Sequence, residues 1–214
     1  MLARSGPVDT ADESARSPDV KAVLASSNPG KLAELRALLE PAGMGVVPQD
    51  AFGFDPPEET GLTFVENALI KARAACTATG LPALADDSGV VVDALGGAPG
   101  VRSARYAGDG ASDADNLARL LEALAGVEPP DRGAAFVCAV VYLRHAQDPC
   151  PIVCEGVWRG RILDAPRGGG GFGYDPVFFV ESLGRTAAEL SRAEKNAVSH
   201  RGQALEQLLG RLAR

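Results

Sequence analysis

The sequence lacks the features that mark several large classes of protein. No apolar run approaches the roughly 18 residues of a membrane-spanning helix, and the first residues contain no apolar core typical of a secretory signal. Basic residues are in the minority, with 21 Lys and Arg against 28 Asp and Glu and a formal net charge of -7. Broad electrostatic binding to DNA or RNA usually requires a basic surface. We therefore expect a cytoplasmic protein with no membrane partner and no nucleic-acid partner, although a few local cations can still bind a small anion.

The chain also lacks a CxxC pair, an internal repeat and a linker that would divide it. Cys150 and Cys154 follow His145, but this spacing fits no standard zinc pattern, so unpaired intracellular thiols are expected. Residues 1–19 are rich in Ser, Ala, Asp and Pro and have no apolar period, which predicts a disordered extension. We expect a single domain over residues 20–214.

Hydrophobic periodicity predicts an α/β protein. A strand at 21–25, a helix at 31–39 and a strand at 44–47 form an opening strand–helix–strand unit. Helices are also predicted at 63–79, from 112 or 113, and at 199–212, and strands at 134–144 and 152–163 should pair as a hairpin. Capping boxes are expected at Thr63 with Glu66 and at Thr186 with Glu189.

The most informative stretch lies at 83–93, where Asp86, Asp87 and Ser88 stand at a glycine-marked break between two short apolar runs. Either run can be a buried strand, so both carboxylates would project from a strand end into a cleft. Burying adjacent carboxylates costs several kcal/mol unless a cation or hydrogen-bond donors compensate. The usual cation is Mg²⁺ or Mn²⁺, bound through oxygen. For these residues taken alone, a solvated turn is the simpler interpretation.

Two further loops carry residues suited to an anion or a metal. The loop between the first strand and helix presents free backbone N–H groups and the positive end of a helix dipole, which suit phosphate, and Lys31 adds a charge. It is not a Walker A loop, because the first Gly of that pattern is missing and Leu32 follows the Lys. In the second loop Glu59 can join Asp87 around a metal while Lys71 holds phosphate oxygens. The simpler interpretations are a plain turn and acidic residues favoured by a helix dipole.

Two loops near the C-terminal end complete the set. Four glycines at 168–171 leave room for a ligand, and Phe172 after them can stack on a base or belong to a core. Lys195, His200 and Arg201 cluster at the start of a helix, where the dipole disfavours cations. Such a local conflict is typical of functional sites and favours recognition of an anion or a carbonyl.

Six segments of the chain, in this order, resemble the inosine triphosphate pyrophosphatase family (noncanonical purine nucleoside triphosphate pyrophosphatases, which include dITP/XTP pyrophosphatases). The segments are 25–31, 59–68, 85–89, 95–106, 171–176 and 199–202, and the resemblance spans about residues 20–209. One departure is Ser26, where the family usually has Thr, and Ser keeps the hydroxyl.

The resemblance implies hydrolysis of ITP, dITP and XTP to the nucleoside monophosphate and pyrophosphate, with Mg²⁺ as the cofactor and Mn²⁺ as a substitute. It also implies an elongated two-lobed α/β fold around a mixed, strongly twisted sheet with flanking helices. The active site would lie in the cleft between the lobes, and the protein would be a homodimer.

Residue roles follow from the resemblance by position. Asp87 would be the general base and a metal ligand, with Glu59 as its metal partner and Asp86 as an outer ligand. The triphosphate would be held by Ser26, Ser27, Asn28, Pro29, Gly30, Lys31, Lys71 and Ser88. The purine would stack on Phe172 and be surrounded by Gly173, Tyr174, Asp175, Lys195, His200 and Arg201.

Base selection has a physical hypothesis. Hypoxanthine and xanthine carry a carbonyl at position 6, where adenine carries an amino group, so donors from His200 or Arg201 would pair with the first two and reject adenine. A pair of such mismatches gives about 10²–10⁴-fold discrimination. The rejection of guanine is not explained in this way, because guanine also carries the 6-carbonyl.

Three alternatives remain open from the sequence. The first is a pyrophosphatase for modified pyrimidine triphosphates, with a similar cleft and another base pocket. The second is a noncatalytic sensor of a purine triphosphate, against which Asp87, Glu59 and Lys31 argue. The third is an α/β scaffold without a small ligand, which leaves the basic cluster at 195–201 unexplained.

Overall fold

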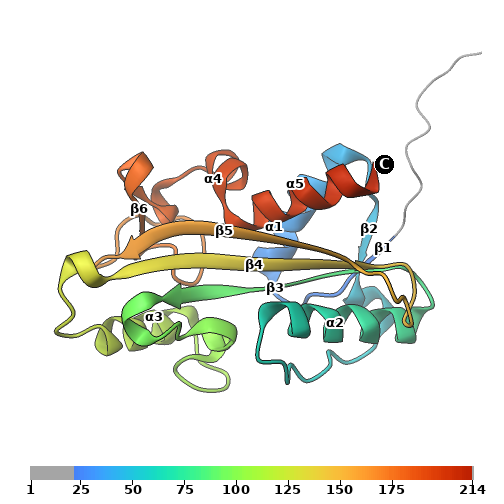
Figure 1. Ribbon diagram of the computed structural model, residues 1–214, viewed down its shortest axis with the longest axis horizontal. Coiled ribbons are helices and arrows are strands. Elements are labelled where there is room, and N and C mark those ends of the chain that lie inside the picture. The colour runs from blue at the N-terminus through green and yellow to red at the C-terminus, as the bar shows by residue number, and fades with distance from the viewer. Residues whose placement is uncertain (1–21, 214) are drawn as a thin grey trace, which may run out of the picture.

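The computed structural model describes residues 22–213, which form a seven-stranded mixed sheet with helices on both faces (Figure 1). The strand order is β2-β1-β3-β4-β5-β6-β7. The strands are β1 (Ala22–Leu24), β2 (Val46–Pro48), β3 (Ala83–Val92), β4 (Gly133–Leu143), β5 (Ile152–Ile162), β6 (Phe178–Val180) and β7 (Arg185–Thr186). β1 runs parallel to β2 and β3, and every later pair is antiparallel. The predicted α/β fold around a mixed sheet is confirmed, whereas the predicted extension at 1–19 lies outside the described residues.

In the described part of the chain, five α-helices flank the sheet: α1 (Pro29–Leu39), α2 (Phe64–Thr79), α3 (Asp113–Ala123), α4 (Arg192–Val198) and α5 (His200–Leu212). Figure 1 shows α1, α4 and α5 on one face and α2 and α3 on the other. None of the helices in the described part of the chain is long and apolar enough to cross a membrane.

Side-chain caps fix where the helices begin. Asn28 caps α1 by accepting a hydrogen bond from the Lys31 backbone N–H at 3.0 Å, and Pro29 occupies the first helical position. Thr63 opens α2 with the predicted capping box. The box predicted at Thr186 is also present, but it opens only a 3₁₀ turn, Ala187–Glu189.

The two ends of the molecule have separate hydrophobic cores. At the β6–β7 end, Leu120, Phe136 and Phe178 belong to one cluster. At the other end, Leu84 packs with α1 and α5 on one face, while Ala85 packs with α2 on the opposite face. The long strands β3, β4 and β5 run through both ends and give the molecule its elongated shape (Figure 1).

The predicted break in the 83–93 stretch is wrong. β3 is continuous through it, and Asp86, Asp87 and Gly89 all pair with residues of β4. Gly89 serves close packing instead of a turn. A Cβ there would lie 2.3 Å from the Ser103 Oγ and 2.5 Å from the Gly100 carbonyl oxygen. Glycine therefore lets the 3₁₀ segment η4 (Gly100–Arg105) lie directly on the strand.

The opening in the sheet comes from the end of β1. This strand is short and pairs with β3 only at Ala83 and Leu84. Within the described chain, the edge of β3 beyond that point has no strand beside it on the β1 side. Asp86 and Asp87 lie on β3 just beyond the last residue of β1. A ligand can therefore reach them from the carboxyl end of β1, which is where α/β proteins usually bind ligands.

Candidate active site

Asp86 and Asp87 point to opposite faces of the sheet, because successive side chains of a strand alternate. Asp87 is on the face covered by α2. Its Oδ2 accepts a hydrogen bond from the Asn67 Nδ2 at 3.2 Å, and its Oδ1 lies 3.4 Å from the Lys71 Nζ. Both partners are on the same helical face, four residues apart. Asn67 is in turn fixed by the Gly61 backbone N–H, which donates to its Oδ1 at 2.8 Å.

Asp86 points the other way, toward α1 and α5. Its Oδ2 lies 3.4 Å from the Lys31 Nζ and accepts a hydrogen bond from the Arg201 Nε at 3.5 Å. Its Oδ1 is buried and has no hydrogen-bond partner among the described residues. Lys31 also lies 3.8 Å from Asp87, so one ammonium group faces both carboxylates.

The two neighbouring carboxyls have opposite pKa shifts. Burial raises the pKa of Asp86, but Lys31 and Arg201 outweigh this effect and hold its pKa well below the usual range. Burial also raises the pKa of Asp87, and Lys71 and Lys31 offset only part of the rise, so the net shift is upward. Asp86 is thus a permanent anion that fixes two cations, whereas Asp87 is a carboxylate with enhanced basicity.

Glu59 and Asp87, which the sequence suggested as partners around a metal, both lie beside the ammonium of Lys71. The Lys71 Nζ lies 2.9 Å from the Glu59 Oε1 and 3.4 Å from the Asp87 Oδ1. Burial lowers the pKa of Lys71, but Asp87, Asp86 and Glu59 together raise it above its usual value. No cluster of three or more His, Cys, Asp or Glu with metal-binding geometry occurs in residues 22–213. Mg²⁺ commonly uses one or two carboxylates and completes its shell with water and phosphate oxygens, so this donor pair fits it.

A first space, here called the cationic chamber, opens beside these groups. It is lined by Ser26, Lys31, Glu59, Lys71, Asp87 and Arg105, among others, and holds about 920 Å³ including the part open to solvent. The N-terminus of α1 borders it, and Ser27 and Asn28 also line it. Pro29 and Gly30 begin α1 and line neither this space nor the next. A helix N-terminus with two lysines is an anion-binding arrangement.

A second space, here called the aromatic pocket, adjoins the first. It is lined by Phe136, Phe172, Tyr174, Asp175, Lys195 and His200, with Gly173 and Arg201, and holds about 570 Å³ including open solvent. Asn28, Lys31, Ser88 and Ala104 line both spaces. The two spaces therefore form one elongated site with an apolar end and a charged end.

Phe172 lies over the start of α1. A Cβ at Gly30 would come within 2.9 Å of the Phe172 ring, so Gly30 allows this approach. The Lys195 Nζ lies 4.8 Å from the centre of the same ring, a cation–π distance. The Asp175 Oδ2 accepts a hydrogen bond from the Phe172 backbone N–H at 2.9 Å, which fixes the loop.

His200 forms part of the apolar wall of the pocket. Its ring stacks on Phe136, with centres 4.9 Å apart and an interplanar angle of 10°. Burial lowers the pKa of His200 well below its usual value, and Arg201 and Lys195 lower it further, so the ring is neutral at pH 7. Its Nδ1 is buried and has no hydrogen-bond partner in the described residues, while the residue itself lines the pocket.

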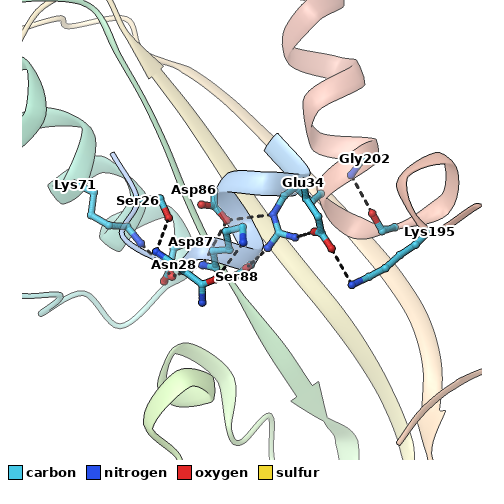
Figure 2. Close-up of polar contacts among 12 residues, drawn as sticks. Ser26, Asn28, Glu34, Lys71, Asp86, Asp87, Ser88, Lys195 and Gly202 are labelled. Carbon is cyan, nitrogen blue, oxygen red and sulfur yellow. Dashed lines mark hydrogen bonds and ion pairs between the residues drawn. The ribbon is translucent and has the colours of Figure 1, made fainter. Parts of the chain in front are cut away.

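A buried network of charges connects the two faces of the site, and Glu34 of α1 lies at its centre. Glu34 accepts hydrogen bonds from the Lys195 Nζ at 2.9 Å and from the Arg201 Nη1. Lys195 also donates to the Asp175 Oδ2 at 2.6 Å, and Arg201 donates to the Ser88 Oγ at 3.0 Å. Figure 2 shows Glu34 between Lys195 and the group formed by Asp86, Asp87 and Ser88.

The sequence interpretation of the basic cluster needs one correction. Lys195 lies in the last turn of α4, not at the start of a helix, and there the dipole favours a cation. His200 and Arg201 do begin α5, with Ser199 as the N-cap. The conflict with the dipole is real only for Arg201, and the carboxylates of Glu34 and Asp86 resolve it.

Several residues at the site were not assigned a role from the sequence, among them Glu34, Asn67, Arg105 and Asp113. Asp113, at the start of α3, accepts a hydrogen bond from the Gly173 backbone N–H at 2.7 Å and lines the aromatic pocket. Asn67 could have been found, because it stands four residues before Lys71 on the same helix. Nothing local marks Glu34, which looks like any solvated glutamate of an amphipathic helix.

Comparison with known proteins identifies the family. The Ham1 family profile matches residues 22–211, almost all of the described chain. The chain belongs to the Ham1 family. Its relatives include the dITP/XTP pyrophosphatase of Shigella flexneri, 60% identical over 192 residues that cover 90% of this chain and 98% of the relative. The dITP/XTP pyrophosphatase of Ralstonia nicotianae is 64% identical over 193 residues, which cover 89% and 95%.

Solved Ham1 structures have the same fold. A HAM1 protein from Coxiella burnetii matches with a TM-score of 0.85 and 54% identity, over 91% of this chain and 98% of that one. A dITP/XTP pyrophosphatase from Mycobacterium abscessus matches with a TM-score of 0.72 and 48% identity, over 88% and 98%. The family resemblance drawn from the sequence motifs is therefore confirmed along nearly the whole chain.

Proposed function

We propose that this protein hydrolyses ITP, dITP and XTP to the nucleoside monophosphate and pyrophosphate, and so removes deaminated purines from the nucleotide pool. The observation that carries the proposal is the pair of adjoining spaces that share Asn28, Lys31 and Ser88. An apolar pocket with stacking faces suits a base, and a chamber with a helix N-terminus and lysines suits a triphosphate. Relatives of at least 60% identity are named dITP/XTP pyrophosphatase, which supports the same assignment.

In the proposed reaction, water attacks the α-phosphorus and pyrophosphate leaves. Asp87 orients this water and takes its proton, a role that suits a carboxylate whose pKa is raised by burial. Lys31 and Lys71 offset the charge that develops on the phosphate oxygens. Asn67 holds Asp87 in place, and its hydrogen bond to the carboxylate leaves the Oδ1 side facing the two lysines.

Glu59 and Asp87 are the residues that would hold Mg²⁺ or Mn²⁺. When bound, the ion would polarise phosphate oxygens and neutralise their charge. The support is the donor pair itself, since both carboxylates already face one cationic group, Lys71. Hard divalent cations prefer such oxygen ligands.

We assign base selection to His200 alone, whereas the sequence left both His200 and Arg201 as candidates. The Nε, Nη1 and Nη2 of Arg201 each already donate to a protein oxygen, whereas the His200 Nδ1 has no protein partner. A neutral imidazole donates to the 6-carbonyl of hypoxanthine or xanthine from its protonated nitrogen, and it must change tautomer to accept a hydrogen bond from the amino group of adenine. This mismatch carries the proposed rejection of adenine nucleotides.

The proposal also includes a homodimer that acts in the cytoplasm, where nucleoside triphosphates are consumed in nucleic-acid synthesis. The dimer rests on the resemblance seen in the sequence motifs. Light scattering on the purified full chain checks it, and a mass equal to one 22.0 kDa chain would contradict it.

The deciding experiment measures pyrophosphate release from dITP, XTP, dGTP, dATP and dUTP by the wild type and by Asp87→Asn, each with Mg²⁺ and with a chelator. We expect rapid release from dITP and XTP, a loss of at least about a hundredfold in Asp87→Asn, and loss with the chelator. Asp87→Asn should still bind dITP. Binding without hydrolysis by the wild type would favour a sensor, and preference for dUTP would favour a pyrimidine enzyme.

A further inference from the structure

Arg105 lines the cationic chamber and has only one weak ion pair with another described residue. It is the last residue of η4, and its side chain is 33% exposed. Its one ion pair within residues 22–213 joins its Nη1 to the Glu59 Oε2 at 3.9 Å, which is too long for a strong hydrogen bond. A guanidinium group has five N–H donors, and most of them are therefore free to bind a ligand.

The segment that carries Arg105 is held rigidly against the sheet. The Ser103 Oγ accepts a hydrogen bond from the Val90 backbone N–H at 3.0 Å, and the Ser103 carbonyl accepts one from the Tyr174 hydroxyl at 2.7 Å. The Ala104 carbonyl accepts a further bond from the Asn116 Nδ2 at 3.1 Å. The position of Arg105 beside the chamber is thus fixed by β3, α3 and the loop that contains Tyr174.

The direction of the site decides which part of a nucleotide Arg105 meets. His200 and Phe136 line only the aromatic pocket, whereas Asp87 and Arg105 line only the cationic chamber. With the base in the pocket and the α-phosphate beside Asp87, the β- and γ-phosphates extend into the chamber. Lys31 and Lys71 approach them from α1 and α2, and Arg105 approaches from η4.

We infer that Arg105 binds the β- and γ-phosphates of the substrate, and the pyrophosphate after cleavage, as a cation from a third wall of the chamber. The inference rests on the proposed function and adds a residue that the motif roles leave unassigned. Glu59 contacts both cations, with its Oε1 toward Lys71 and its Oε2 toward Arg105. A pyrophosphate group offers several charged oxygens, and the planar guanidinium fork matches two of them at once.

Arg102 is a matched control, because it is an arginine of the same 3₁₀ segment, is exposed and lines neither space. The test uses calorimetry to measure binding of inorganic pyrophosphate and of inosine monophosphate to the wild type, Arg105→Ala, Arg105→Gln and Arg102→Ala. Thermal unfolding verifies that each variant is folded, and the glutamine variant replaces the alanine variant if the latter is unstable.

We expect both Arg105 variants to bind pyrophosphate about tenfold more weakly or worse, with inosine monophosphate affinity unchanged. Arg102→Ala should match the wild type for both ligands. Unchanged pyrophosphate binding in the Arg105 variants would overturn the inference, and so would an equal loss of both ligands, which would mean that Arg105 only holds the loop. Because binding is measured directly, this result is separate from whether the wild type hydrolyses dITP.

Discussion

At the scale of single residues, sequence neighbours have different roles because a strand separates their environments. Asp86 faces Lys31 and Arg201, whereas Asp87 faces α2, where one ammonium group is shared with Glu59. The first carboxyl has a lowered pKa and the second a raised pKa. A pair of carboxyls with opposite shifts is a common way for an enzyme to keep one fixed charge and one base.

His200 gives a prediction at the same scale. His200→Phe keeps the stacking on Phe136 but removes both ring nitrogens, and with them the proposed contact to the 6-carbonyl. We expect the ratio of kcat/KM for dITP to that for dATP to fall about ten- to a hundredfold. Steady-state kinetics on both substrates measures this ratio. An unchanged ratio in a variant with normal thermal stability would show that another group selects the base.

At the scale of elements, η4 reaches the site only because Gly89 has no side chain. Gly89→Ala would place a Cβ within 2.5 Å of the Gly100 carbonyl oxygen, so η4 must move away from β3. We expect a loss of about 1–3 kcal/mol in the free energy of unfolding, with weaker pyrophosphate binding, since Arg105 moves with η4.

Gly169→Ala is the matched control for this substitution. No atom lies within 4 Å of the position of its Cβ, and its φ lies outside the left-handed region. Urea unfolding should therefore place it close to the wild type. Equal stability of Gly89→Ala and Gly169→Ala would mean that η4 does not need close contact with β3.

The turn that joins β4 and β5 gives a pH prediction. Asp148 accepts hydrogen bonds from the Arg144 side chain and from the backbone N–H groups of Arg144 and Cys150, and these contacts lower its pKa. A lowered pKa in the folded state stabilises the protein above the unfolded pKa, near 3.9, and this contribution disappears as the pH falls below it. Asp148→Asn should unfold more easily at pH 7, and the difference from the wild type should shrink toward pH 3. Thermal unfolding across this range measures it, and a constant difference would contradict the assignment.

At the scale of the whole molecule, the sequence predicted local features better than tertiary contacts between distant segments. Periodicity and caps located α1, α2, α5 and the β4–β5 hairpin because those signals lie within a few residues. Gly89 was misinterpreted because a glycine required for packing looks the same in sequence as one required for a turn. Glu34 and Asp113 were missed because their partners, Arg201 and Gly173, are brought to them only by the tertiary fold.

The site itself was predicted through its motifs, and the structure adds how they meet. The end of β1 leaves the edge of β3 open beside Asp86 and Asp87, and the two ends of the molecule contribute the walls of the site. Asn28 and Lys31 come from one end, and Phe172 and Asp113 come from the other. No pattern of spacing encodes that arrangement, because it depends on the lengths of β1 and of the three long strands.

This elongated site has a consequence for turnover that follows from avidity. In the proposed binding mode, an intact triphosphate would bridge the aromatic pocket and the cationic chamber, so each half would raise the effective concentration of the other at its own subsite. Cleavage beside Asp87 separates the two halves, and each product is then held by one subsite alone. The bond between the α- and β-phosphates is therefore the link that would let one ligand use both subsites. Once it is broken, each product binds at one subsite only, which favours release of both.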